Sequence, residues 1–201
     1  MNIVALILAA GNSSRMGEAK QLLPWAQDTL LGNAIRMAAR SQVKKVYVVL
    51  GAEAKRIKAS LQGSEAEMII NQNWSRGMGT SISCGVTGIL NSEIEPNAIL
   101  VMLEDQPFLD DDYLNLLMKH FKANDGRIIA TKYGSKIGVP AIFDKSFYTA
   151  LKDLDGVEGA SVLIAHNKQV CFGVDPGKKA LDLDTQEEYT NFKTSNFKNT
   201  P

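Results

Sequence analysis

A continuous apolar run, Ile3 to Leu8, leads directly into a loop that contains glycine, arginine and lysine. An uninterrupted apolar run followed by small residues predicts a parallel strand that is buried on both faces of its sheet. Loops that follow such strands commonly carry function. We therefore expect an α/β fold whose chemistry begins at the carboxyl end of this first strand.

The loop after the strand has the composition of a phosphate-binding site. Gly11 has no side chain, so backbone amides can approach a triphosphate closely, and the residues before it are small. Arg15 and Lys20 supply positive charge. The residues that we expect to bind the nucleotide are Leu8, Ala9, Ala10, Gly11, Ser13, Ser14, Arg15 and Lys20. In the alternative interpretation, the glycines only turn the chain and the charges are solvated.

The spacing of this loop differs from two better-known phosphate loops. A P-loop has four residues between its glycines and then Lys-Ser or Lys-Thr. Here five residues separate Gly11 from Gly17, and Lys20 follows after two more residues. The GxGxxG pattern also fails, because Ser13 stands at its second glycine, which disfavours a dinucleotide-dependent dehydrogenase.

The run from Leu8 to Trp25 resembles the signature loop of nucleotidyltransferases with the glycosyltransferase-A-like fold. Within these it is most similar to the molybdenum cofactor cytidylyltransferases and their guanylyltransferase relatives. The resemblance extends from Val4 to about Phe192. It implies one Rossmann-like, three-layer nucleotidyltransferase domain over residues 1–192, built on a mainly parallel sheet and followed by a polar tail at 193–201.

Alternating strand and helix patterns along the chain independently predict a mainly parallel sheet covered on both faces. Strands are expected near residues 3–8, 45–50, 67–71, 98–103, 127–131, 141–143, 169–174 and 180–183, and apolar stripes predict helices over 31–38, 82–90 and 114–121. Asp110 to Asp112 are expected to begin the last of these helices rather than to act in catalysis. The length of 201 residues, 45% of them apolar, suits a single core.

Charge and cysteine content narrow the class of protein. The chain has 22 basic and 22 acidic residues in a mixed pattern, so we expect neither a nucleic-acid surface nor a membrane surface. Cys84 and Cys171 are too few for a disulfide framework or a zinc site, which indicates a reducing compartment. The first strand leaves no room for a signal peptide, and no apolar run approaches the length of a membrane helix. We expect a cytoplasmic protein.

A second buried run, Ile99 to Leu103, ends in Glu104 and Asp105 before Pro107. Ligands of open α/β sheets bind at the carboxyl ends of strands, and Mg²⁺ prefers one or two carboxylates together with substrate phosphates. Asp105 is therefore the expected catalytic metal ligand, unless it only caps the turn at Pro107. The family that this chain resembles usually has glycine at position 104. Glu104 would obstruct the nucleotide, point away into the sheet, or add a carboxylate near the metal.

A further pair of carboxylates, Asp182 and Asp184, lies on one face of a short alternating segment. The family has an Asp-Ile-Asp-Thr-Pro pattern here, and the resemblance implies that Asp184 completes the Mg²⁺ site, with Asp182 behind it. Asp184 would serve equally well as the cap of a helix that begins near Thr185.

The segment from Asn71 to Ser81 resembles the family pattern Asn-x-x-Trp-x-x-Gly-Met-x-x-Ser. The resemblance implies that Asn73, Gly77 and Ser81 help to seat the base and ribose, whereas Ser81 acts as a helix cap in the alternative interpretation. Ala10 resembles the cytosine-using branch of the family, which favours CTP over GTP.

The acceptor side is carried by two weaker resemblances, Gly138 to Phe143 and Leu154 to Ser161, with Ser161 in place of the family's arginine. The leading hypothesis is a Mg²⁺-dependent enzyme in which Arg15, Lys20 and Asp105 assist transfer of CMP from CTP to molybdopterin cofactor, with release of pyrophosphate. The alternatives are a GTP-using guanylyltransferase, a nucleotidyltransferase for sugar or alcohol phosphates, and a non-catalytic nucleotide-binding accessory protein of a molybdenum enzyme.

Overall fold

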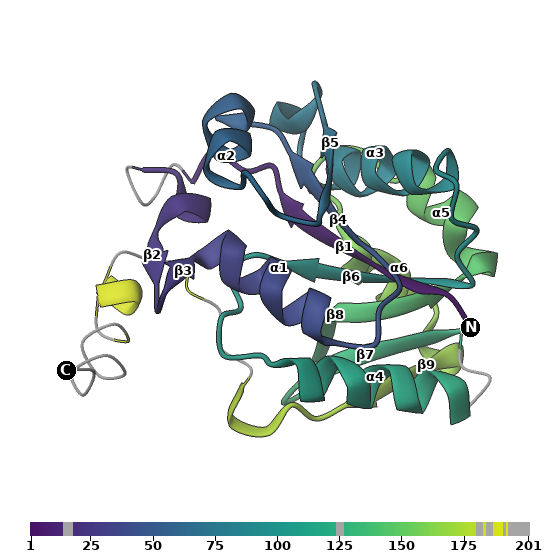
Figure 1. The fold of residues 1–201 in the computed structure, drawn as a ribbon. Helices are drawn as coiled ribbons and strands as arrows, with labels where there is room; N and C mark the ends of the chain where they lie inside the picture. The colour runs from purple at the N-terminus through teal and green to yellow at the C-terminus, as the bar shows by residue number, and fades with distance from the viewer. Residues whose placement is uncertain (14–17, 124–126, 180–182, 184–186, 191, 193–201) are drawn as a thin grey trace.

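The chain forms one layered α/β body in which a twisted sheet lies between two layers of helices (Figure 1). The structure is a computed structural model that describes residues 1–13, 18–123, 127–179, 183, 187–190 and 192. Among these residues the main sheet has seven strands: β1 (Ile3–Ala9), β4 (Val46–Leu50), β5 (Glu67–Ile70), β6 (Ala98–Leu103), β7 (Ile128–Tyr133), β8 (Lys136–Asp144) and β9 (Cys171–Val174). The predicted α/β class is confirmed.

The strand order is β5-β4-β1-β6-β8-β7-β9. The first four strands in this order pair in parallel, β9 pairs in parallel with β7, and β8 runs antiparallel to both of its neighbours. The sheet is therefore mainly parallel, as predicted. The hairpin of β7 and β8 is longer than the two short strands expected from the sequence. The strand expected at 180–183 lies outside the described residues except for Leu183.

Helices cover both faces of the sheet (Figure 1). One face carries α1 (Leu30–Arg40) and α4 (Asp111–Ala123), and the other carries α3 (Met78–Leu90), α5 (Tyr148–Lys152) and α6 (Ala160–His166). The short helix α2 (Ala54–Ser60) links β4 to β5. The predicted apolar stripes correspond to α1, α3 and α4. Asp110 accepts a hydrogen bond of 2.9 Å from the backbone N–H of Tyr113, which confirms the expected start of α4.

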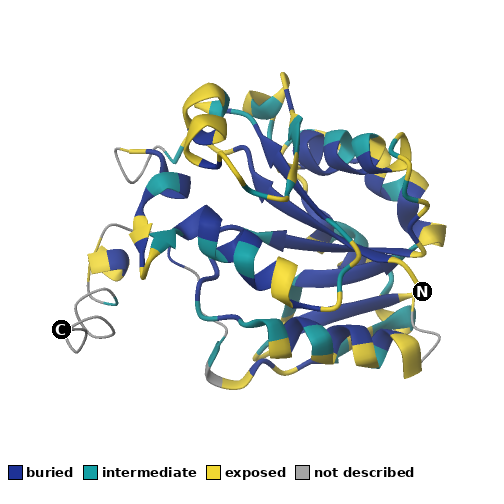
Figure 2. Cartoon of the chain, in the orientation of Figure 1, coloured by how far each residue is buried: buried dark blue, intermediate teal, exposed yellow. Residues whose placement is uncertain are grey.

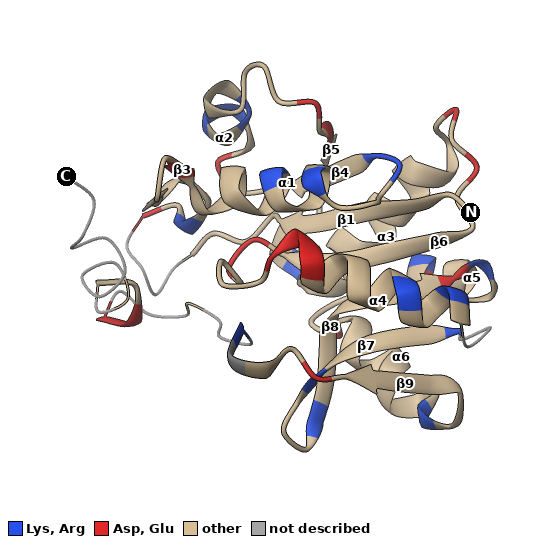
Figure 3. Cartoon of the chain, turned by 60° about the horizontal axis from the view of Figure 1, so that its bottom comes forward, with Lys and Arg blue, Asp and Glu red and all other residues tan. Residues whose placement is uncertain are grey.

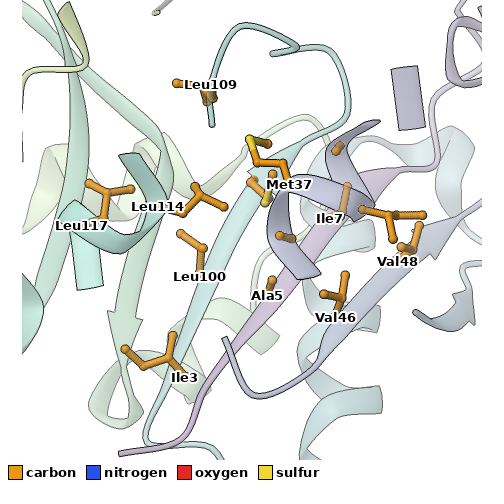
Figure 4. Close-up of a cluster of buried hydrophobic side chains, with 14 of the residues drawn as sticks. Ile3, Ala5, Ile7, Met37, Val46, Val48, Leu100, Leu109, Leu114 and Leu117 are labelled. Atoms are coloured by element: carbon orange, nitrogen blue, oxygen red, sulfur yellow. The ribbon is translucent and has the colours of Figure 1, made fainter. Parts of the chain in front are cut away.

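The core lies on both faces of β1, as its continuous apolar sequence predicts. Ala5 and Ile7 pack beneath α1 and α4 in one cluster (Figure 4), whereas Leu6 and Leu8 belong to the cluster on the other face. The strands are buried throughout their centres, and the exposed residues gather on the outer sides of the helices and in loops (Figure 2). Among the described residues, no helix is long and apolar enough to cross a membrane.

A third, smaller apolar cluster joins the C-terminal part of the chain to a short ribbon of β2 (Pro24–Trp25) and β3 (Asp28–Thr29). Its members are Leu23, Trp25, Leu30, Phe108, Leu183, Tyr189 and Phe192. The rings of Trp25 and Phe108 meet edge to face with centroids 5.4 Å apart, and the Tyr189 hydroxyl donates a 2.6 Å hydrogen bond to the Pro24 carbonyl. These contacts hold Leu183, Tyr189 and Phe192 against the ribbon of β2 and β3.

Candidate active site

The candidate site lies where β1 and β6 end. The two strands are parallel neighbours with Leu8 opposite Leu103, so the residues that follow them emerge at the same edge of the sheet. Gly11 follows one strand and Asp105 the other. The structure thus brings together the two segments that the sequence analysis singled out separately.

An ion pair closes this edge. Lys20 lies on the 3₁₀ turn η1 (Lys20–Leu22), and its Nζ is 2.9 Å from Oδ2 of Asp105. Only 8% of the lysine side chain and 17% of the aspartate side chain are exposed. At such low exposure the attraction between opposite charges is stronger than at a solvated surface. The backbone N–H of Lys20 also donates a 3.0 Å hydrogen bond to Oγ of Ser13, which holds the loop after β1 against η1.

Gln21 is a site residue that the sequence analysis missed. Its side chain is 1% exposed, and its Nε2 donates to the carbonyl oxygens of Gly11 (2.9 Å) and Ala9 (3.3 Å). The same nitrogen lies 3.3 Å from Oε1 of Glu104. The only signal in the sequence is its position after Lys20, because an amide side chain carries no charge or motif that marks a site.

Glu104 faces this network and the adjoining cleft. It is 9% exposed and lies next to Asp105. Burial and, to a smaller extent, the negative charge of Asp105 raise the pKa of Glu104 to about 8, whereas Lys20 and Gln21 oppose this rise. The Glu104 carboxylate lies against the Gln21 amide and beside the cleft.

A cleft of about 470 Å³ opens beside these residues, a size typical of a small-molecule site. It is lined by Leu8, Ala10, Gly11, Asn12, Trp74, Ser75, Gly77, Met78, Ser81, Leu103, Glu104 and Asp105. Ala9, Ser13 and Lys20 are not among the lining residues, but Lys20 forms its ion pair with the lining residue Asp105. Asn73, which was expected to contact the base or ribose, does not line the cleft.

The far wall of the cleft is the start of α3. Gly77 precedes this helix with φ of 127°, and no side chain caps it. Ser81 is therefore not the cap; its hydroxyl lies inside the first turn and accepts a 3.0 Å hydrogen bond from Nδ2 of Asn71. Asn71 also donates to Thr80 Oγ1 at 2.9 Å, so one buried amide fixes both hydroxyls.

The segment Leu154 to Ser161 packs directly on this wall. The backbone N–H of Gly79 donates a 3.0 Å hydrogen bond to the carbonyl of Gly156. A Cβ at position 77 would lie only 2.2 Å from that same carbonyl oxygen, so glycine is required there for packing as well as for its positive φ. One segment that resembles an acceptor-binding region thus lies against the segment expected to hold the nucleotide.

The second acceptor-like segment is tied to the end of β6. Gln106 follows Asp105, and its Nε2 donates to the Tyr133 hydroxyl (2.8 Å) and the Val139 carbonyl (3.3 Å). These contacts place the β7–β8 hairpin, which contains Gly138, next to the cleft residue Asp105. In the view of Figure 3, basic and acidic residues are interspersed along the chain.

Four candidate residues, Ser14, Arg15, Asp182 and Asp184, lie outside the described residues. Between the last two, Leu183 donates a backbone hydrogen bond of 3.0 Å to the Asp105 carbonyl.

Asp105 suits Mg²⁺ as a carboxylate in a cleft large enough for a nucleotide, because this ion takes few protein ligands and several phosphate oxygens. No group of three or more His, Cys, Asp or Glu side chains within the described ranges forms a metal cage of protein ligands alone.

The fold and this site define a nucleotidyltransferase of the α/β class, with a glycine-containing loop facing a carboxylate across adjacent strand ends. Residues 5–170 match the MobA-like NTP transferase domain, and the chain belongs to this family.

Similarity to individual proteins extends over nearly the whole chain. The nicotine blue oxidoreductase of Paenarthrobacter nicotinovorans is 29% identical over 92% of this chain and 94% of its own length. The molybdenum cofactor cytidylyltransferase of Escherichia coli is 24% identical over 95% of both chains. Among solved structures, Rv0371c of Mycobacterium tuberculosis superposes with a TM-score of 0.81 at 25% identity, covering 96% of this chain and 97% of that one.

Proposed function

We propose that this nucleotidyltransferase transfers CMP from CTP to a phosphate of a molybdopterin-type cofactor, with Mg²⁺, and releases pyrophosphate. The observation that carries the proposal is the Lys20–Asp105 pair at 2.9 Å, which sets a cation and a carboxylate beside the Gly11 loop. The Escherichia coli relative, named a molybdenum cofactor cytidylyltransferase, supports the choice of base and acceptor. Ala10 lines the cleft and resembles the residue of the cytosine-using branch of the family, which supports CTP over GTP.

The reaction needs no protein nucleophile. A phosphate oxygen of the acceptor attacks the α-phosphorus of CTP, the bond from that phosphorus to the bridging oxygen breaks, and this oxygen leaves with pyrophosphate. The acceptor phosphate is already ionised at neutral pH, so the protein positions the reactants and stabilises the developing charge. Lys20 does this from η1, and we assign the same role to Arg15.

Asp105 would hold Mg²⁺, and we propose Asp184 as its second carboxylate. When bound, the ion neutralises phosphate charge and orients the triphosphate. Gly77 and Ser81, which line the cleft, are proposed to seat the base and ribose at the start of α3. The free thiols of Cys84 and Cys171 support a cytoplasmic location. The proposed recipient of the product is a molybdenum enzyme. The proposed domain spans residues 1–192, with 193–201 as a tail.

The test is pyrophosphate release with CTP, GTP, ATP and UTP in turn, in the presence of Mg²⁺ and molybdopterin cofactor. Release with CTP that is lost in Lys20→Ala is the expected result. Release with GTP alone would assign the chain to guanylyl transfer. Release only with a sugar or alcohol phosphate as acceptor would replace the molybdopterin assignment.

Two outcomes would overturn the enzyme assignment. Tight CTP binding without pyrophosphate release for every acceptor would indicate a nucleotide-binding accessory protein of a molybdenum enzyme. Because one relative is named an oxidoreductase, the same preparation should also be assayed for oxidation of NADH and NADPH. Redox turnover without nucleotidyl transfer would contradict the proposal.

A further inference from the structure

We propose that Gln21 is a positioning residue that turns the phosphate loop so that its amides, and not its carbonyls, face the nucleotide. This inference rests on the proposed function, because it assigns an anionic ligand to the cleft. Its basis is that Nε2 of Gln21 reaches the carbonyl oxygens of Ala9 and Gly11 at 3.3 and 2.9 Å from a position that is 1% exposed.

A loop that binds phosphate must direct its backbone N–H groups, and not its carbonyl groups, toward the ligand. Each peptide unit carries a donor and an acceptor, and a carbonyl oxygen turned toward a triphosphate repels it. Packing does not set the orientation of Gly11, since even an added Cβ there would meet nothing within 4 Å. Hydrogen bonds must therefore set the peptide planes, and Gln21 supplies them from behind the loop, outside the cleft lining.

The orientation of the Gln21 amide is determined by its surroundings. Its nitrogen faces three acceptors, namely the two carbonyls and Oε1 of Glu104 at 3.3 Å, whereas its oxygen lies 3.5 Å from the Ser13 hydroxyl. The reversed amide would place an oxygen against three oxygens. Glu104 thus links the end of β6 to the group that holds the loop, in parallel with the Lys20–Asp105 pair.

Gln21→Glu tests the inference, because it keeps the size of the side chain and removes the donor. The readouts are the Kd values for CTP and for inorganic tripolyphosphate, measured by calorimetry without metal or acceptor, together with urea unfolding. We expect about tenfold or greater weakening for both ligands, since one donor contributes roughly a factor of ten or more. Gln62→Glu, at an exposed loop position, is the control for the added negative charge.

A second variant separates the two contacts of Gln21. In Gln21→Glu/Glu104→Gln the amide at position 104 can donate to the carboxylate at position 21, so the link to β6 returns while the carbonyls still lack their donor. We expect this variant to regain stability but not phosphate affinity.

Unchanged Kd values in Gln21→Glu, or full recovery of affinity in the double variant, would overturn the role of Gln21. If wild-type protein binds tripolyphosphate but none of the four nucleoside triphosphates, the proposed function fails while the loop assignment stands. If it binds neither, both fail.

Discussion

The Nζ atom of Lys20 lies 2.9 Å from Oδ2 of Asp105, so the loop after the first strand is clamped to the end of β6. Both charges are already nearly desolvated, with 8% and 17% of their side chains exposed. Much of the cost of removing them from water is therefore met during folding rather than when a ligand binds. This arrangement suits catalysis by preorganised charge.

Replacement of Lys20 by alanine should lower the turnover of pyrophosphate release by about two orders of magnitude or more, as expected for loss of one stabilising donor. Substrate binding should weaken less than turnover, because the developing negative charge is greatest in the transition state. Steady-state kinetics with CTP check this. Lys44→Ala, at an exposed site, is the control. A variant with wild-type turnover would remove Lys20 from the catalytic groups.

Asp105→Asn should weaken the dependence on metal while it preserves the shape of the site. The amide oxygen can still accept from Lys20, but the negative charge that attracts Mg²⁺ is lost. We expect the Mg²⁺ concentration for half-maximal activity to rise about tenfold, for a loss of roughly 1.4 kcal/mol. Calorimetric titration of Mg²⁺ into the CTP complex gives an independent readout. Full activity in Asp105→Ala would exclude it as the essential metal ligand.

Gly77→Ala should destabilise the protein and disturb the wall of the cleft. The alanine would hold a φ of 127°, and its Cβ would meet the Gly156 carbonyl oxygen at 2.2 Å. Backbone strain and overpacking together should cost about 2 kcal/mol or more in urea unfolding. Gly63→Ala is the matched control, with φ of 84° but nothing within 4 Å of the added Cβ. Equal losses in the two variants would show that the contact with Gly156 is unimportant.

Glu104→Gln should stabilise the metal-free protein by an amount that grows with pH. The native carboxyl keeps its proton to a pKa of about 8, whereas in the unfolded chain it loses the proton near the ordinary value of 4.5. Between these two pH values the unfolded wild-type chain binds fewer protons than the native protein, so rising pH favours its unfolding. The glutamine variant has no titrating group at position 104 and lacks this contribution. Urea unfolding in EDTA at pH 5, 6, 7 and 8 measures the difference, and a constant difference would contradict the raised pKa.

Elements that depend on local pattern were predictable from the sequence. The apolar runs at Ile3 and Ile99 identified the two central strands, because only strands covered on both faces tolerate an uninterrupted apolar sequence. Asp110 marked the start of α4 for a similarly local reason. The sequence predicted that Lys20 and Asp105 lie at the same edge of the sheet, but not that they form an ion pair.

Contacts between distant segments were not predictable in this way. Gln21 has no motif, and its proposed role emerges only from the three acceptors that surround its amide where β1 and β6 end. The fit of Gly77 against Gly156 likewise depends on packing between α3 and a turn almost eighty residues later. The roles of Arg15 and Asp184 stay predictions.

The hydrogen bond from Leu183 to the Asp105 carbonyl has a consequence for how the site matures. Every strand of the main sheet in the described part of the chain is synthesised before Leu183, so a nascent polypeptide can assemble its sheet first. The Asp105 carbonyl gains this backbone partner only when residue 183 has emerged from the ribosome. The order of synthesis therefore completes the contacts of Asp105 only after all the described strands of the main sheet have been made.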